Sequence, residues 1–172
     1  RVLPERYALF QPELDKVYSY TDNGWTAIAE KKYAITKDMR LVDFGSPEAW
    51  GRPIVDLTLI YEDVAIVVDW KTGKVPQPKY QDYGQLNFSS LMVMKDQPTI
   101  DKVAAKYWYI THKKLSATVT TTRSLEDQRW GILLSQVADA ERCFETNTFE
   151  PKRNGLCKNY CDVTSCVFNG KK

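Results

Sequence analysis

The sequence predicts an α/β fold, because strand-like and helix-like segments are interspersed along its 172 residues. Apolar alternation and β-branched runs predict strands within residues 25–35, 54–61, 64–69, 103–111 and 115–122. Apolar residues at helical spacing predict helices over residues 12–20, 79–94 and 124–145. Because most domains contain about 100–200 residues, we expect residues 1–172 to form a single domain.

The net charge and the lack of long apolar segments exclude some classes of protein. The net charge of +2 is not that of a polycation, so any contact with nucleic acid must come from local basic clusters. No apolar run approaches the roughly 18 residues of a membrane span, and the N-terminus lacks the apolar segment of a signal peptide, so we expect no membrane association. The chain begins with Arg1 rather than methionine, and we therefore expect it to be a piece of a longer protein.

The N-terminal elements are a helix, a turn and a strand. The helix is expected over residues 12–20, and the sequence Thr-Asp-Asn-Gly at 21–24 is typical of a turn. Residues 25–35 alternate as a strand does and include Glu30, which by itself is an exposed or ion-paired residue. Residues 37–53 are rich in glycine and proline, which predicts a loop with short strand content.

The segment Ile54–Lys74 predicts a hairpin with polar groups at one edge. Residues 64–68 are almost all apolar, which is typical of a strand covered on both faces. Asp69 ends this strand, and Lys71 follows two residues later. In an extended chain the side chains of Asp69 and Lys71 therefore point to the same face, while Trp70 points to the other. Because a buried strand rarely ends in Asp-Trp-Lys, this ending indicates that the polar side chains have a role where the chain leaves the strand.

Asp56 adds a second carboxylate to this edge. A tight turn at Glu62 and Asp63 would pair the two strands antiparallel and make Asp56 and Asp69 neighbours in space. Two carboxylates and an ammonium group in one place suit a hard divalent cation such as Mg²⁺, which polarises a phosphodiester. The alternative is an ordinary surface ion pair, for which Asp-x-Lys is a common arrangement.

The next segment is a proline-containing connector followed by a helix. Residues 75–78 contain Pro76 and Pro78, which exclude a helix until the connector ends. The helix expected over residues 79–94 carries Gln85 near its middle, where an amide is by itself a polar surface residue.

The last regular elements are a hairpin and a long helix. Residues 103–111 and 115–122 alternate and predict an antiparallel pair of strands. The helix over residues 124–145 has Ser124 as its expected N-cap and an apolar face that we expect to pack on the sheet.

Cysteines are confined to the C-terminal part of the chain, at Cys143, Cys157, Cys161 and Cys166. Without a secretory signal, reduced thiols or a metal site are expected rather than disulfides. The spacings are compatible with Zn²⁺ and with an iron–sulfur cluster, and free or packed thiols are the remaining alternative.

Asp56, the segment Asp69-Trp70-Lys71-Thr72-Gly73-Lys74 and Gln85 together resemble the RecB-like and Cas4-like branch of the PD-(D/E)xK nuclease superfamily, over about residues 25–168. Within this branch the sequence is similar to small exonucleases of bacterial viruses. The resemblance implies a restriction-endonuclease-like core, with a mixed sheet flanked by helices. It implies a Mg²⁺- or Mn²⁺-dependent deoxyribonuclease, most simply an exonuclease.

The resemblance also implies roles for individual residues. Asp56 and Asp69 would bind the metal, with the backbone carbonyl of Trp70 as a further ligand. Lys71 would position the attacking water or stabilise the phosphate, and Gln85 would assist it. Glu30 would be a third acid near the metal, since family members carry a glutamate on the strand before the first aspartate.

Other implied features lie outside this cluster. The cysteine segment 157–166 resembles the closing segment of iron–sulfur members, which hold a 4Fe-4S cluster. Lys74 and Lys79 are candidate contacts to linear duplex or single-stranded DNA, in the host bacterial cytoplasm if the protein is viral. Trp70, Trp108 and nearby tyrosines are candidates for stacking on bases, with core packing as the alternative.

Two alternative functions follow from the same residues. A non-catalytic DNA-binding module of a recombination or replication assembly would keep the fold and lose cleavage. Position 89, where the family has a tyrosine four residues after Gln85, is serine here and favours that alternative. A cysteine-based metal module unrelated to nucleases would bind iron or zinc and cleave nothing.

Overall fold

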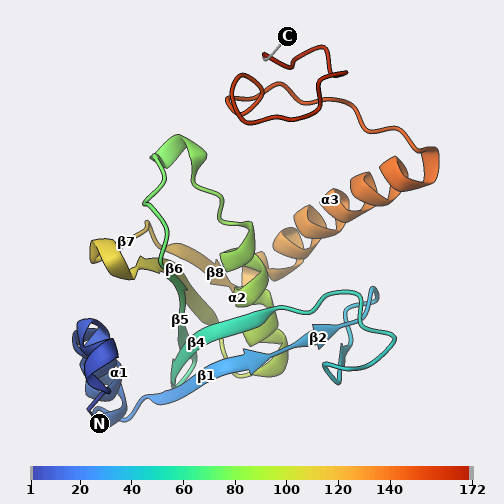
Figure 1. Cartoon of the computed structure of the whole chain (residues 1–172). Coiled ribbons are helices and arrows are strands. Elements are labelled where there is room, and N and C mark those ends of the chain that lie inside the picture. The colour runs from blue at the N-terminus through green and yellow to red at the C-terminus, as the bar shows by residue number, and fades with distance from the viewer. Residues whose placement is uncertain (1, 171–172) are drawn as a thin grey trace. The chain divides into compact units, whose positions relative to one another are not determined.

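A computed structural model describes residues 2–170 of the chain (Figure 1). Two compact units are distinguished, Arg1–Gly131 and Ile132–Lys172. The first contains the central sheet, and the second contains most of the last helix and the cysteine tail. The expectation that the whole chain is a single domain stays a prediction.

The first unit is built on a mixed sheet of six strands in the order β1-β4-β5-β6-β7, with β8 also paired to β6. The parallel pair is β5 with β6, and the other neighbours are antiparallel. This arrangement confirms the predicted α/β class with a mixed sheet. The strands are β1 (Thr26–Lys32), β4 (Ile54–Tyr61), β5 (Val64–Lys71), β6 (Lys102–Tyr109), β7 (Lys114–Leu115) and β8 (Val119–Thr122).

The β4–β5 hairpin has the predicted turn and register. Glu62 takes the left-handed backbone conformation (φ 52°) that a tight hairpin turn needs. Leu57 pairs with Val68 and Thr58 with Val67, so alternate residues of both strands share one face. Because this ladder stops at Val68 while the β5–β6 ladder continues to Lys71, the end of β5 has a strand partner on one side only.

Helix α2 (Gly84–Asp96) connects the parallel strands β5 and β6 and forms the main core with them. Leu86, Leu91 and Met92 are buried, as are the β5 and β6 residues Val67 and Ala105. The helix begins five residues later than predicted. The segment before it forms a short turn, η2 (Pro78–Tyr80), and then an extended stretch, and Gly84 N–H donates to the Asp82 carboxylate at 2.8 Å where the helix starts.

Helix α1 (Gln11–Asp22) lies by the opposite face of the sheet, preceded by the turn η1 (Glu5–Phe10). Val17 and Tyr20 line a cavity of about 260 Å³ together with Leu57 and Ile66 of that face. Ile66 is only half-buried, whereas Ala65 and Val67, on the face toward α2, are fully buried. β5 therefore has a helix on both faces, as predicted, but the face toward α1 is less completely buried because a single short helix lies there.

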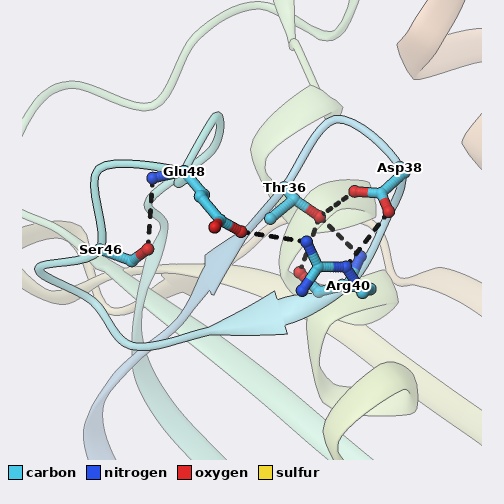
Figure 2. A network of polar contacts seen from close by, with 5 residues as sticks. All are labelled: Thr36, Asp38, Arg40, Ser46 and Glu48. Atoms are coloured by element: carbon cyan, nitrogen blue, oxygen red, sulfur yellow. Dashed lines mark hydrogen bonds and ion pairs between the residues drawn. The ribbon is translucent and has the colours of Figure 1, made fainter.

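The segment between β1 and β4 is a braced loop. It contains β2 (Ala34–Ile35) and β3 (Leu41–Val42), a small separate sheet. Figure 2 shows the Arg40 guanidinium between the carboxylates of Asp38 and Glu48, at 3.2 and 3.0 Å. At the end of the loop, the Tyr33 backbone N–H donates to the Pro53 carbonyl at 3.0 Å, next to the start of β4, the strand that carries Asp56.

The predicted strand over residues 115–122 is interrupted and becomes β7 and β8. At the interruption, the Ser116 hydroxyl accepts a hydrogen bond from the Tyr107 backbone N–H at 3.0 Å, in place of a regular ladder bond. The turns η3 (Ile110–His112) and η4 (Arg123–Leu125) flank this region. Both short strands still pair antiparallel with β6, as predicted.

Helix α3 (Glu126–Thr146) confirms the predicted long helix, with a different start. Ser124 lies in η4 with its hydroxyl 2.9 Å from that of Thr122, so the helix begins after it. Trp130 packs edge-on against Phe88 of α2 and is the buried residue of α3. Within residues 2–170, no helix has both the length and the apolar character needed to cross a membrane.

Candidate active site

Asp56 and Asp69 meet at the edge of the sheet beside α2. Continuing the β4–β5 register by one step from Leu57 and Val68 places Asp56 opposite Asp69, on the same face. Asp69 is only 5 % exposed, and Asp56 is half-buried. The charge of Asp56 is one of the influences that raise the pKa of Asp69, as expected for two neighbouring carboxylates.

Lys71 and Gln85 complete a compact polar cluster with Asp69. The Lys71 ammonium lies 2.6 Å from Asp69 Oδ1 and donates to Gln85 Oε1 at 2.9 Å. The Gln85 amide N–H₂ donates in turn to Asp69 Oδ2. Each of the three side chains therefore contacts the other two, although Gln85 comes from α2 and the others from β5.

Burial has the largest influence on the pKa of Asp69. Removal from water raises the pKa of its carboxyl above the ordinary value, and the Asp56 charge raises it further. The hydrogen bond and charge of Lys71, followed by the Gln85 amide, act in the opposite direction. A further positive charge next to Asp69 would therefore stabilise its ionised form.

Tyr107 is a member of the site that the sequence reading missed. It pairs with Asp69 in the parallel β5–β6 register, and its ring centroid lies 5.0 Å from the Lys71 ammonium. Tyr83, the residue before α2, stacks on it with centroids 6.3 Å apart. Burial raises the pKa of Tyr107 to about 12, so the phenol is neutral at physiological pH. The place of Tyr107 beside Asp69 follows from the pairing register of β6 with β5, and the sequence pattern carries no signal for that register.

The donor atoms at this edge suit a hard divalent cation. Trp70 N–H donates to Asp56 Oδ2 at 2.8 Å, so the Trp70 backbone faces Asp56 and not a strand partner. Because the N–H and C=O of one residue in a strand point to the same neighbour, the Trp70 carbonyl lies on the Asp56 side. Carboxylate and carbonyl oxygens are the ligands that Mg²⁺ prefers, and one or two carboxylates suffice because Mg²⁺ keeps several waters.

Glu30 lies on the strand next to Asp56. The β1–β4 register is unbroken and places Glu30 opposite Asp56, between the pairs Ala29–Leu57 and Lys31–Val55. The Glu30 side chain is exposed, and its backbone takes a left-handed conformation (φ 51°). Throughout residues 2–170, no three His, Cys, Asp or Glu side chains gather closely enough to hold a metal ion. The role suggested for Glu30 as a third acid therefore stays a prediction.

The cysteines lie in the second unit. Cys157, Cys161 and Cys166 line a hollow of about 460 Å³ in the tail, while Cys143 lies on α3. All of them are free thiols, and the Asn154 backbone N–H points at Cys157 Sγ at 3.3 Å.

The basic and aromatic candidates fall into two groups. Lys74 and Lys79 are exposed on the segment between Lys71 and α2, next to the cluster in sequence. Trp108 lies on the face opposite Asp69, is only 9 % exposed and has the Lys16 ammonium 4.5 Å from its ring centroid. Packing against α1 is the observed arrangement of Trp108, so the stacking suggested for it is not supported.

Comparison with known protein families gives a match over most of the chain. A family model described as the PD-(D/E)XK nuclease superfamily matches residues 19–166, from α1 through the cysteine tail. No curated protein matches the chain.

Proposed function

Because the chain belongs to the PD-(D/E)XK nuclease superfamily, we propose that it is a metal-dependent deoxyribonuclease that hydrolyses the phosphodiester bonds of DNA. The single observation that supports this best is the mutual contact of Asp69, Lys71 and Gln85 beside Asp56. A surface ion pair would not require burial of Asp69 or a third partner from a different element. The sheet and its flanking helices are consistent with the restriction-endonuclease-like fold of the superfamily.

The residues of the cluster have distinct proposed roles. Asp56, Asp69 and the Trp70 carbonyl hold Mg²⁺ or Mn²⁺. When bound, the cation polarises the phosphodiester and lowers the pKa of a water molecule. Lys71, fixed between Asp69 and Gln85, directs its ammonium at the attacking water or at the phosphate oxygen on which charge develops. Gln85 keeps Lys71 and Asp69 in this orientation.

We further place the protein in the RecB-like branch, among exonucleases of the kind found in bacterial viruses. The support is the Asp-Trp-Lys-Thr-Gly-Lys segment with Gln85 after it, and the structure brings Lys71 and Gln85 into contact. Lys74 and Lys79 are proposed to contact the DNA backbone, which would make binding dependent on salt. The proposed setting is the bacterial cytoplasm, alone or with a recombination or replication protein.

The decisive experiment is incubation of labelled linear and covalently closed circular DNA with the protein and Mg²⁺ or Mn²⁺. An exonuclease degrades the linear form and leaves the circle intact. Cleavage of both forms would indicate an endonuclease, and binding without cleavage in either metal would favour the non-catalytic module. Chelation by EDTA should stop all cleavage, and cleavage that persists would contradict the metal-dependent proposal.

Gln85→Ala is expected to lower kcat by about tenfold or more, with a smaller change in KM. The reason is that the amide orients Lys71 and Asp69 and does not itself supply the cation or the charge. Gln97→Ala is the matched control, because Gln97 follows the same helix and bonds Asp96 at its far end. Equal rates for the two variants would show that the contacts of Gln85 are not used in catalysis.

For the cysteine tail we propose an iron–sulfur cluster in place of a single zinc ion. The support is that three of the thiols line one hollow of about 460 Å³, and cysteine thiolates are the ligands of iron–sulfur clusters. Cys143 is the remaining cysteine available as fourth ligand.

Protein purified without oxygen is expected to contain iron and to absorb broadly near about 400 nm. Cys161→Ala should remove both signals, whereas Ser165→Ala, beside Cys166 in the same segment, should keep them. Zinc without iron, or neither metal, would contradict the cluster. The measurement requires no nuclease activity.

A further inference from the structure

We propose that Tyr80 and Lys79 form a binding site for an unpaired nucleotide of the DNA substrate, with the Tyr80 ring stacked on the base and the Lys79 ammonium on the adjacent phosphate. The inference rests on the proposed nuclease function and extends it to how the strand is held. It concerns the segment 72–83, here named the arch, which connects β5 to α2.

Both ends of the arch are at the candidate active site. Lys71 immediately precedes it, Gln85 follows it, and their side chains are joined by a hydrogen bond of 2.9 Å. Figure 1 shows the arch as a green loop that rises from the sheet, with a short helical turn at its top, and returns to α2. Compact surface loops of this length with adjacent ends are frequently functional.

The arch is held in shape at its base and along its length. The Tyr109 hydroxyl donates to Gln81 Oε1 at 3.0 Å, and the Thr111 hydroxyl donates to the Thr72 carbonyl at 3.2 Å. Pro76 and Pro78 restrict the backbone on the ascending side. Such a loop loses little conformational entropy when a ligand binds, which favours a preformed site.

The top of the arch presents an aromatic ring and a positive charge together. Tyr80 is 68 % exposed, and the Lys79 ammonium lies 4.8 Å from its ring centroid. A hydrogen bond from Tyr80 N–H to the Gln77 carbonyl (2.8 Å) closes the turn that displays both side chains. Exposed aromatic rings beside basic groups are the recurring elements of sites for single-stranded nucleic acid, where every base offers a face for stacking.

The tryptophans considered for this role are placed less favourably. Trp70 and Trp108 belong to the sheet face opposite Asp69, where Trp108 is nearly buried. Tyr80, by contrast, lies on the same connection that carries Lys74, between the two elements that form the site. A strand stacked on Tyr80 would therefore be held by a loop whose two ends adjoin the carboxylates.

The chain provides a matched control. Tyr7 is also an exposed tyrosine (44 %) with a cation over its ring, since the Arg6 guanidinium carbon lies 4.8 Å from the centroid. It lies on η1, which is not part of the arch. Replacing Tyr7 by alanine removes the same kind of cation–aromatic pair from a surface outside the proposed site.

Binding is measured with short single-stranded oligonucleotides that carry the fluorescent base 2-aminopurine at successive positions, in EDTA so that cleavage cannot occur. We expect quenching at one position near the strand end with the unaltered protein. Tyr80→Ala should abolish that quenching and weaken binding by about tenfold, while Tyr80→Phe and Tyr80→Trp should restore both. Lys79→Gln should weaken binding and reduce the salt dependence by about one charge.

The possible results separate this inference from the nuclease proposal. Equal affinity and quenching for Tyr80→Ala and Tyr7→Ala would overturn the inference, as would failure of Tyr80→Phe to restore quenching. Cleavage of linear DNA with metal by both alanine variants at the rate of the unaltered protein would also overturn it and leave the nuclease proposal standing. Position-specific quenching that depends on Tyr80 would support the site even in a protein that binds DNA without cutting it.

Discussion

Asp69→Asn is expected to lower kcat/KM for DNA by at least about 10³-fold and, at the same time, to raise the melting temperature of the metal-free protein. Activity is lost because the substitution removes a carboxylate from the cation and from Lys71, 2.6 Å away. Stability rises because the neutral amide avoids burying a charge at a position that is 5 % exposed and next to Asp56. A gain of about 1 kcal/mol would raise the melting temperature by about 2–4 °C.

The stability effect has a definite pH dependence. Since the pKa of Asp69 in the folded protein is raised from the ordinary value of 3.8, the folded state binds more protons than the unfolded state just above that pH. The unaltered protein therefore loses stability as pH rises through this interval, and the loss is complete above the folded pKa. Asp69→Asn lacks this decline, so the difference in melting temperature should appear above about pH 4 and persist at neutral pH.

Metal provides an independent measurement of the same residue. Mg²⁺ or Mn²⁺ should raise the melting temperature of the unaltered protein, because a ligand of the folded state stabilises it by mass action. It should leave Asp69→Asn nearly unchanged, whereas Asp63→Asn, in the β4–β5 turn at the other end of the same strand pair, should respond normally. A similar shift in both variants would exclude Asp69 as a ligand. DNA binding by Asp69→Asn should be retained.

Lys71→Met is expected to lower kcat by about 10²–10³-fold with little change in KM. Methionine keeps most of the length of the side chain but removes the charge that we propose acts on the transition state, together with the cation–aromatic contact of that charge with the Tyr107 ring. Lys106→Met is the matched control, because Lys106 lies on the opposite face of the sheet and lines the cavity beside α1. A loss confined to KM would indicate that Lys71 binds DNA without taking part in the reaction.

The same variant should shift the pH dependence of the remaining activity. Lys71 lowers the pKa of Asp69 through its charge and hydrogen bond, so its removal lets burial and Asp56 raise that pKa further. If ionised Asp69 is required, the acid limb of the kcat profile moves to higher pH in Lys71→Met. An unchanged acid limb together with a reduced rate would show that Lys71 acts elsewhere than on Asp69.

The local pattern was sufficient for much of the fold. The apolar run at 64–68, the acidic turn at Glu62 and Asp63 and the alternation at 103–109 predict strands that the structure contains. Boundaries were less predictable where side chains replace backbone bonds. Ser116 interrupts one predicted strand in this way, and Asp82 marks the later start of α2. Hydrophobic periodicity predicts neither boundary, because each depends on a hydrogen bond between a side chain and a backbone N–H.

Some features of the candidate site are likewise predictable from local sequence, and others depend on how the elements pack. Asp69, Lys71 and the face they share follow from a two-residue spacing in a strand, and Asp56 follows from the hairpin, so the groups proposed to carry the chemistry are predictable from the local pattern. Contact between Gln85 and Lys71, by contrast, depends on where α2 begins and how it crosses the sheet.

Which further residues lie next to the proposed site depends on the tertiary structure. Tyr107 lies there because β6 runs parallel to β5 in a register that aligns it with Asp69, and Glu30 lies opposite Asp56 because β1 pairs with β4 in an unbroken register. The two ends of the arch meet because Lys71, just before it, is hydrogen-bonded to Gln85, just after it. The physical reason is common to all three: spacing fixes the direction of a side chain within one element, whereas pairing register and helix placement, set by packing across the core, fix which elements face each other.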